Sequence, residues 1–78
     1  MQYNGYLVLD LCSDGKHNSY AFPTIEEASQ RFRECVSFYN EELTEKELED
    51  AVTDRSWADY SGNAVYLEPL NTTVTTLF

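Results

Sequence analysis

The sequence is poor in basic residues, cysteine, proline and glycine, and each shortage excludes a class of protein. Five lysines and arginines stand against fourteen aspartates and glutamates, which gives a formal net charge of −9 over 78 residues. So negative a chain is not expected to bind nucleic acid or an anionic lipid surface directly. Two cysteines are too few for a disulfide scaffold, and two prolines with three glycines leave no linker or low-complexity tract.

The sequence lacks a hydrophobic run long enough to cross a bilayer, and its opening stretch does not have the features expected of a secretory leader. The apolar part of the opening stretch MQYNGYLVLDLC is short, and neither a basic segment nor a small-residue cleavage site accompanies it. We therefore expect a soluble cytoplasmic protein with no membrane partner. Cys12 and Cys35 are expected to be reduced thiols in that compartment.

The first part of the chain predicts a β-hairpin. Ser13-Asp14-Gly15-Lys16 contains the Asp-Gly pair that is typical of a two-residue turn. That turn would pair Cys12 with His17, so that Cys12 would point away from Cys35 on the following helix. The apolar face of the hairpin would then consist of Leu7, Leu9, Leu11, Tyr20 and Phe22.

Two capping boxes predict the starts of two helices, at Thr24 with Glu27 and at Thr44 with Glu47. Apolar residues at spacings of three and four follow each start, which is typical of a helix with one buried side. The stripe of the first helix consists of Ile25, Ala28, Phe32, Cys35, Val36 and Tyr39, and the narrower edge of the second consists of Leu48, Ala51 and Val52.

The last third of the chain returns to strand patterns. Strands are predicted over residues 57–60, 64–68 and 72–78, separated by a Ser61-Gly62-Asn63 turn and by Pro69. The elements read ββααββ, with two or three strands at the end. We expect one compact α+β domain over residues 1–78, an antiparallel sheet of four or five strands with two helices packed on one face.

The stretch EELTEKELEDAVTD, residues 41–54, carries seven carboxylates against one lysine. A helix over this whole stretch would rise roughly 21 Å and present about one carboxylate per 3 Å, close to the phosphate spacing of about 3.4 Å along a DNA strand. Packing of Leu43 and Leu48 would hold it in place. Either the charge serves solubility alone, or it forms a partner-binding surface made of Glu41, Glu42, Glu45, Glu47, Glu49, Asp50 and Asp54.

Aromatic residues near this stretch are candidate interface anchors, because exposed Tyr and Trp dominate many protein interfaces. Trp57 and Tyr60 follow the acidic stretch and complete the predicted partner-binding set. Three further tyrosines, Tyr3, Tyr6 and Tyr66, lie at or near predicted strand positions, and at least some of these side chains should also face outward. The aromatic residues assigned to the core are Tyr20, Phe22, Phe32 and Tyr39.

Chemistry-bearing residues meet at one place in the predicted hairpin, where Asp10, Cys12 and His17 would share a face. These residue types could bind zinc or form a nucleophile with its base. A fourth ligand at a recognisable spacing is missing, and no glycine-rich loop or evident oxyanion site accompanies the cysteine. We therefore expect neither an enzyme nor a bound metal or other cofactor.

At the level of class, the chain resembles the small acidic α+β proteins that phages and mobile elements encode to block host nucleic-acid enzymes, such as anti-CRISPR and anti-restriction proteins. The resemblance rests on size, charge, the absence of catalytic signatures and the acidic segment 41–54. It implies a DNA-mimic type of inhibitor in the host cytoplasm that occupies a basic nucleic-acid channel or locks a conformation without chemistry.

The leading hypothesis is thus a monomeric or dimeric inhibitor that docks its acidic helix and aromatic neighbours on a basic protein surface. The rival is a structural or regulatory module, antitoxin-like or a homodimer that assembles through its strands, in which the charge serves solubility only. Its contact would be the stretch 72–78 or the face that carries Tyr6 and Val8.

Overall fold

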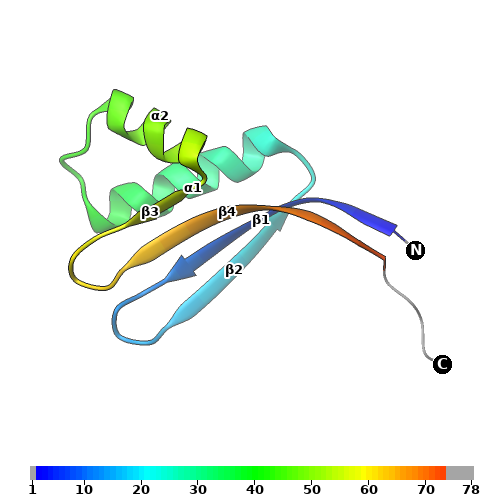
Figure 1. Ribbon diagram of the computed structural model, residues 1–78, viewed down its shortest axis with the longest axis horizontal. Coiled ribbons are helices and arrows are strands. Elements are labelled where there is room, and N and C mark those ends of the chain that lie inside the picture. Colours follow the sequence, from blue (N-terminus) through cyan, green and yellow to red (C-terminus); the bar gives the residue numbers. More distant parts are fainter. Residues whose placement is uncertain (1, 74–78) are drawn as a thin grey trace.

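The computed structural model describes residues 2–73, and the side chains of residues 5–70. Its elements are, in chain order, β1 (Gln2–Leu11), β2 (His17–Phe22), α1 (Ile25–Tyr39), α2 (Glu45–Asp54), β3 (Ser56–Ala58) and β4 (Ala64–Thr73). The four strands form one antiparallel sheet in the order β2-β1-β4-β3. Both helices lie on the same side of the sheet (Figure 1). The predicted α+β class, with an antiparallel sheet and two helices, is confirmed.

Both helices begin at the predicted threonines. The Thr44 hydroxyl accepts the Glu47 N–H at 3.2 Å, and the Glu47 carboxylate accepts the Thr44 N–H at 3.1 Å, which completes a capping box. At α1 the Thr24 hydroxyl accepts the Glu27 N–H at 3.3 Å. The reciprocal bond predicted for the Glu27 side chain does not form within the described residues.

Loss of the Thr44 cap is expected to destabilise the domain. Thr44→Ala removes the acceptor for one of the unpaired N–H groups of the first turn of α2, so the free energy of unfolding should fall by about 1 kcal/mol in a urea titration. The matched control is Thr53→Ala in the same helix, where the hydroxyl only donates back to the Glu49 carbonyl and alanine is the better helix former. An equal loss in both variants would contradict the capping role.

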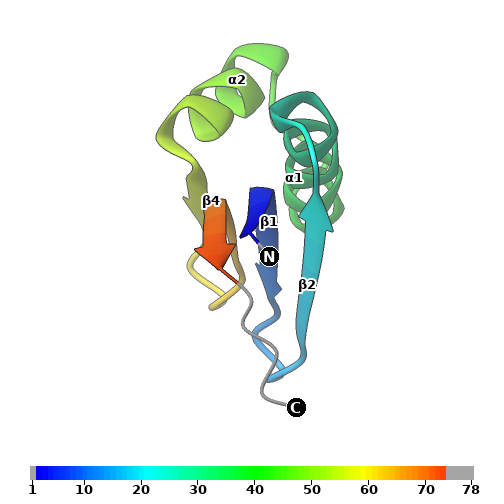
Figure 2. The ribbon, with the colours of Figure 1, turned by 90° about the vertical axis from the view of Figure 1, so that its right-hand side faces the viewer.

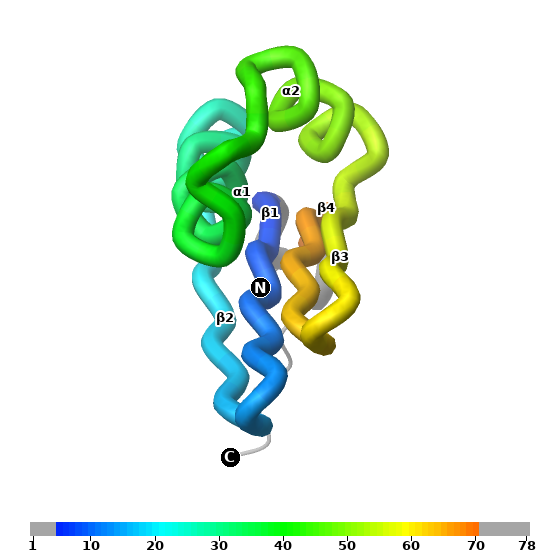
Figure 3. Tube along the Cα trace, turned by 90° about the vertical axis from the view of Figure 1, so that its left-hand side faces the viewer, coloured from blue at the N-terminus to red at the C-terminus, as the bar shows by residue number. Residues whose placement is uncertain are grey.

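The core lies between α1 and the sheet. α1 contacts β1, β4 and β2, whereas α2 packs on α1 and on β3, so α2 sits higher above the β3–β4 half of the sheet (Figure 3). The predicted apolar stripes of both helices face inward. The buried members of the core are Val8, Ala28, Phe32, Cys35, Val36, Leu48, Ala51, Val65 and Leu67.

The register of the β1–β2 hairpin differs from the prediction by one residue. Leu11 pairs with His17 and Val8 pairs with Tyr20. Cys12 then lies opposite Lys16, and the loop between them has three residues, Ser13, Asp14 and Gly15. The Cys12 N–H donates to the Lys16 carbonyl at 2.9 Å. Gly15 occupies a left-handed conformation with φ 93°, which is the usual turn-and-bulge form of a three-residue hairpin loop.

This register reverses the predicted faces of the hairpin. Since residues paired directly across two strands share a face, Tyr20 and Phe22 lie with Val8 on the helix side. The three leucines predicted beside them, Leu7, Leu9 and Leu11, lie on the opposite side. The core positions predicted for Tyr20, Phe22, Phe32 and Tyr39 are confirmed, because all four belong to the core or pack against it.

The end of the chain also differs from the prediction. Pro69 does not separate two strands, because β4 continues through Pro69 and Asn71 to Thr73 and pairs with β1 along its whole length. β3 pairs only with residues 64–66 of β4, so beyond that point β4 is an edge strand and can accommodate a residue without an N–H group. Of the predicted strand 72–78, residues 74–78 lie outside the described residues.

Candidate functional site

The acidic segment predicted as a partner-binding surface is divided between a turn and a helix. Glu41 and Glu42 lie in the turn before α2, because the helix begins only at Glu45. α2 therefore carries five of the seven carboxylates and rises about 15 Å rather than 21 Å. Leu48 is buried and Leu43 packs against the core, so this segment is held in a fixed position. All seven carboxylates are exposed.

Three of these seven carboxylates already have partners within the protein. Glu45 forms an ion pair with Arg33 of α1 at 3.0 Å, and Asp50 forms one with Lys46 at 3.2 Å. Glu47 is occupied by the capping box. Within residues 2–73, no ion pair is formed by the remaining four, Glu41, Glu42, Glu49 and Asp54. These four are the carboxylates best placed to meet cations of a partner.

The negative charge of the protein is concentrated on one side of the molecule. Residues 25–54, which form both helices and the turn between them, contain ten acidic and three basic residues. α2 forms the outer ridge of this layer, on the side away from the sheet (Figure 2). A cationic partner would therefore approach this helical layer first.

The two predicted aromatic anchors have different positions. Trp57 points to the helix side, half-buried, and stacks on Tyr39 with ring centres 6.0 Å apart and an angle of 7° between the rings. β3 directs the ring toward the helices, where it packs against the core, so Trp57 is less accessible to a partner than an outward-facing anchor would be. Tyr60 is fully exposed in the β3–β4 loop. Of the other tyrosines, Tyr6 packs against the core and Tyr66 is half-buried on the opposite side of the sheet.

The β3–β4 loop that carries Tyr60 is fixed by Asp59. Its carboxylate accepts the N–H groups of Ser61 and Asn63 and the side-chain amide of Asn63, each at 2.9 Å. These hydrogen bonds lower the pKa of Asp59, and the one from the Asn63 side chain has the largest effect. Asn63 also accepts the Ser13 N–H at 2.8 Å, which joins this loop to the β1–β2 loop.

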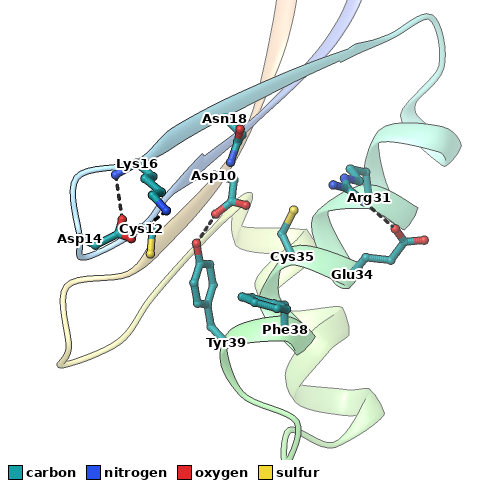
Figure 4. A pocket seen from close by; sticks show the side chains of 10 residues that line it. All are labelled: Asp10, Cys12, Asp14, Lys16, Asn18, Arg31, Glu34, Cys35, Phe38 and Tyr39. Atoms are coloured by element: carbon teal, nitrogen blue, oxygen red, sulfur yellow. Dashed lines mark hydrogen bonds and ion pairs between the residues drawn. The ribbon is translucent and has the colours of Figure 1, made fainter.

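A cavity of about 450 Å³ lies between the β1–β2 hairpin and α1, and Figure 4 shows its side chains. Within it the Tyr39 hydroxyl donates to the Asp10 carboxylate at 2.5 Å. Burial, followed by the hydrogen bond and the charge of Asp10, raises the pKa of Tyr39 well above its usual value. Sequence reasoning missed this pair because it depends on the corrected hairpin register.

Both cysteines line this cavity as free thiols. The prediction that Cys12 points away from Cys35 is therefore wrong, because the three-residue loop turns Cys12 to the helix side. The pKa of the Cys35 thiol is raised, mainly by burial and then by the charge of Asp10. A raised pKa favours the protonated thiol, which is the form without nucleophilic reactivity.

The hairpin residues weighed as metal ligands or as a catalytic set do not meet. His17 pairs with Leu11 on the side of the sheet that faces away from the helices, whereas Asp10 and Cys12 line the cavity on the helix side. Among the described residues, no group of three potential metal-ligating side chains occurs. The one-residue shift in register is the physical reason for the difference.

Sequence reasoning also missed the side of the sheet that no described element covers. We call it the open sheet face, and its apolar centre consists of Leu7, Leu9, Leu11, Ala21, Ala64 and Tyr66. Among strand residues 5–70, Glu68 is the single formally charged side chain on this face. The apolar run Tyr6–Leu9 within β1 was the available signal, since strands buried on both faces have such runs.

Neither α1 nor α2 has the length and apolar composition needed to cross a membrane, and residues 2–73 contain no further helix. No protein-family model matches the chain, and the searches of curated proteins and of solved structures found no significant match.

Proposed function

We propose that the protein is a non-enzymatic binding protein that inhibits a nucleic-acid-handling protein by docking on its basic surface. The contact surface consists of the turn before α2 and the exposed side of α2, and Tyr60 in the β3–β4 loop is a separate candidate anchor. This is the mode of action of the DNA-mimic, anti-CRISPR and anti-restriction class of inhibitors, which act in the cytoplasm of a host cell.

One observation carries this proposal: carboxylates that form no ion pair with the described residues are held in place by a packed helix. Glu49 and Asp54 stand on α2, whose position is fixed by Leu48 in the core and by the Thr44 cap. A fixed array loses less conformational entropy on binding than carboxylates on a flexible tail, so it can meet a basic groove at a lower cost. Binding through these carboxylates should weaken as salt is added, because salt screens their attraction to a basic surface.

The test compares capture by the wild-type protein and by a charge-reversed variant, Glu41→Lys with Glu49→Lys and Asp54→Lys. These positions are exposed and have no role in the cap or in the ion pairs, so the fold should remain. Immobilised wild-type protein should capture basic proteins from a nuclease-treated lysate, with recovery falling about tenfold or more between 50 and 300 mM salt. The variant should capture none of them.

The matched control reverses three carboxylates elsewhere, with Glu26→Lys, Glu27→Lys and Glu68→Lys, and therefore has the same net charge as the first variant. Its capture should resemble that of the wild type, and added duplex DNA should release the captured proteins from both. Equal capture by the wild type and by the α2 variant would eliminate the proposed surface.

The rival interpretation is a homodimer assembled through its strands, and one of its two candidate contacts is the face that carries Tyr6 and Val8. Val8 is fully buried beneath α1 and Tyr6 is half-buried against the core, so this face offers little surface to a second molecule. Residues 74–78 of the other candidate contact, the stretch 72–78, lie outside the described residues.

A further inference from the structure

We propose that the open sheet face is a dimer interface whose occupant is the same face of a second copy of this chain. This inference is independent of the function proposed for α2. It starts from the sequence of β1, in which Leu7, Leu9 and Leu11 all point away from the helices while Asp10 points toward them. An antiparallel sheet with one solvated face normally has the opposite arrangement, with polar residues outside.

The distribution of charge favours a second copy as the partner. With a net charge of −9, two copies repel each other wherever their helical layers approach. The open sheet face has one carboxylate, Glu68, and no lysine or arginine among the described strand residues, so it is the side on which two copies meet with the least repulsion. A basic partner would instead be drawn to the helical layer.

The shape of the face is compatible with its own copy. The leucines form a ridge along the central strand β1, and the paired positions on β2 are the small residues Ala21 and Ser19 opposite Leu7 and Leu9, with His17 opposite Leu11 at the end of the ridge. In a two-fold arrangement the ridge of each copy lies over the small residues of the other, as in sheets that pack face to face about 10 Å apart. Tyr66 on β4 lies directly beside Leu9 and adds aromatic area at the centre.

The area of the face is sufficient for a modest dimer. Ten-residue strands β1 and β4 in a four-stranded sheet, at about 3.3 Å per residue and about 4.8 Å between strands, give a face of roughly 500 Å². Two such faces bury about 1,000 Å², which is at the lower limit for a specific protein interface. The dimer should therefore be concentration-dependent, and both acidic helical layers remain accessible on its outer sides.

The experiment measures mass by sedimentation equilibrium at high micromolar concentration. The wild type should have twice the chain mass of 9.0 kDa, and dimerisation should persist or strengthen as salt is added, because salt screens the repulsion between the outer layers. Leu9→Glu places a charge at the centre of the interface and should give a monomer. Phe38→Glu is the matched control on exposed α1 surface, and it should remain a dimer.

A second variant keeps the test decisive if Leu9→Glu does not fold, as judged by circular dichroism. Ala21→Glu changes an exposed position of the same face, so it should fold normally and still lower the dimer fraction. A wild type with the mass of one chain would overturn the inference, and so would folded Leu9→Glu and Ala21→Glu variants that stay dimeric. Because salt weakens the contact proposed for α2 but not this one, failure of one proposal is distinguishable from failure of the other.

Discussion

Phe32→Ala should remove most of the stability of this domain. Phe32 is fully buried in α1 against the sheet, and truncation of a buried phenylalanine costs about 3–5 kcal/mol through lost burial and a residual cavity. A domain of this size has a free energy of unfolding of only about 4–12 kcal/mol. Urea titration at one fixed protein concentration, followed by the fluorescence of the single tryptophan Trp57, should therefore show a midpoint shifted far toward zero.

The control for this variant is Phe38→Ala, the same substitution on the same helix. The Phe38 side chain is 78% exposed and makes only an edge contact with the Tyr39 ring, so its truncation should change the free energy of unfolding by about 1 kcal/mol or less. Trp57 is a suitable reporter because its ring stacks on Tyr39 only in the folded state. A similar loss in both variants would show that α1 does not bury the side assigned to it.

The second large effect is expected at the Tyr39–Asp10 pair. Tyr39→Phe removes the hydroxyl that donates to the half-buried Asp10 carboxylate, and a polar group left without its partner costs about 1–3 kcal/mol. Urea titration near neutral pH should show this loss. Tyr60→Phe, which removes a hydroxyl from a fully exposed ring, should leave the free energy of unfolding within about 0.5 kcal/mol of the wild type.

The same pair predicts a loss of stability in alkali. The pKa of Tyr39 is raised above its unfolded value, so the neutral phenol stabilises the fold fully below about pH 10, and this contribution is lost as the pH rises through the folded pKa. Above about pH 10, this one proton should lower the free energy of unfolding by about 1.4 kcal/mol per pH unit. The raised pKa of the Cys35 thiol acts in the same direction.

Tyr39→Phe separates the two contributions to this alkaline loss. The variant should lose the part of the slope that belongs to the phenol and keep the part that belongs to Cys35. An alkaline slope identical to that of the wild type would show that Tyr39 ionises as freely in the folded protein as in the unfolded chain.

The two helices, and the residues that each of them buries, could be predicted from the sequence because the signals lie close together along the chain. A threonine cap and a glutamate three residues later define the start of α2, and the apolar spacing defines which side of each helix is buried. The acidic segment was located for the same reason. The ion pair between Glu45 of this segment and Arg33 was not predicted, because the two residues lie on different helices, twelve positions apart in the sequence.

The sheet was predicted less well, because the register of a hairpin depends on one residue of its loop. Asp14-Gly15 favours a two-residue turn, but in the structure a three-residue loop forms, with Gly15 in the bulge. The shift by one residue moved Leu9 to the open sheet face and Cys12 into the cavity beside Cys35. It also separated His17 from the two residues with which it had been grouped.

The sequence by itself therefore determined the class of the fold, the two capped helices and the concentration of negative charge on them, since each follows from neighbours along the chain. Only the tertiary structure decided which face of β1 meets α1. Both faces of that strand are apolar, with Val8 on one and Leu9 on the other, so composition cannot choose between them. The choice depends on the loop geometry together with the packing of β1 between β2 and β4.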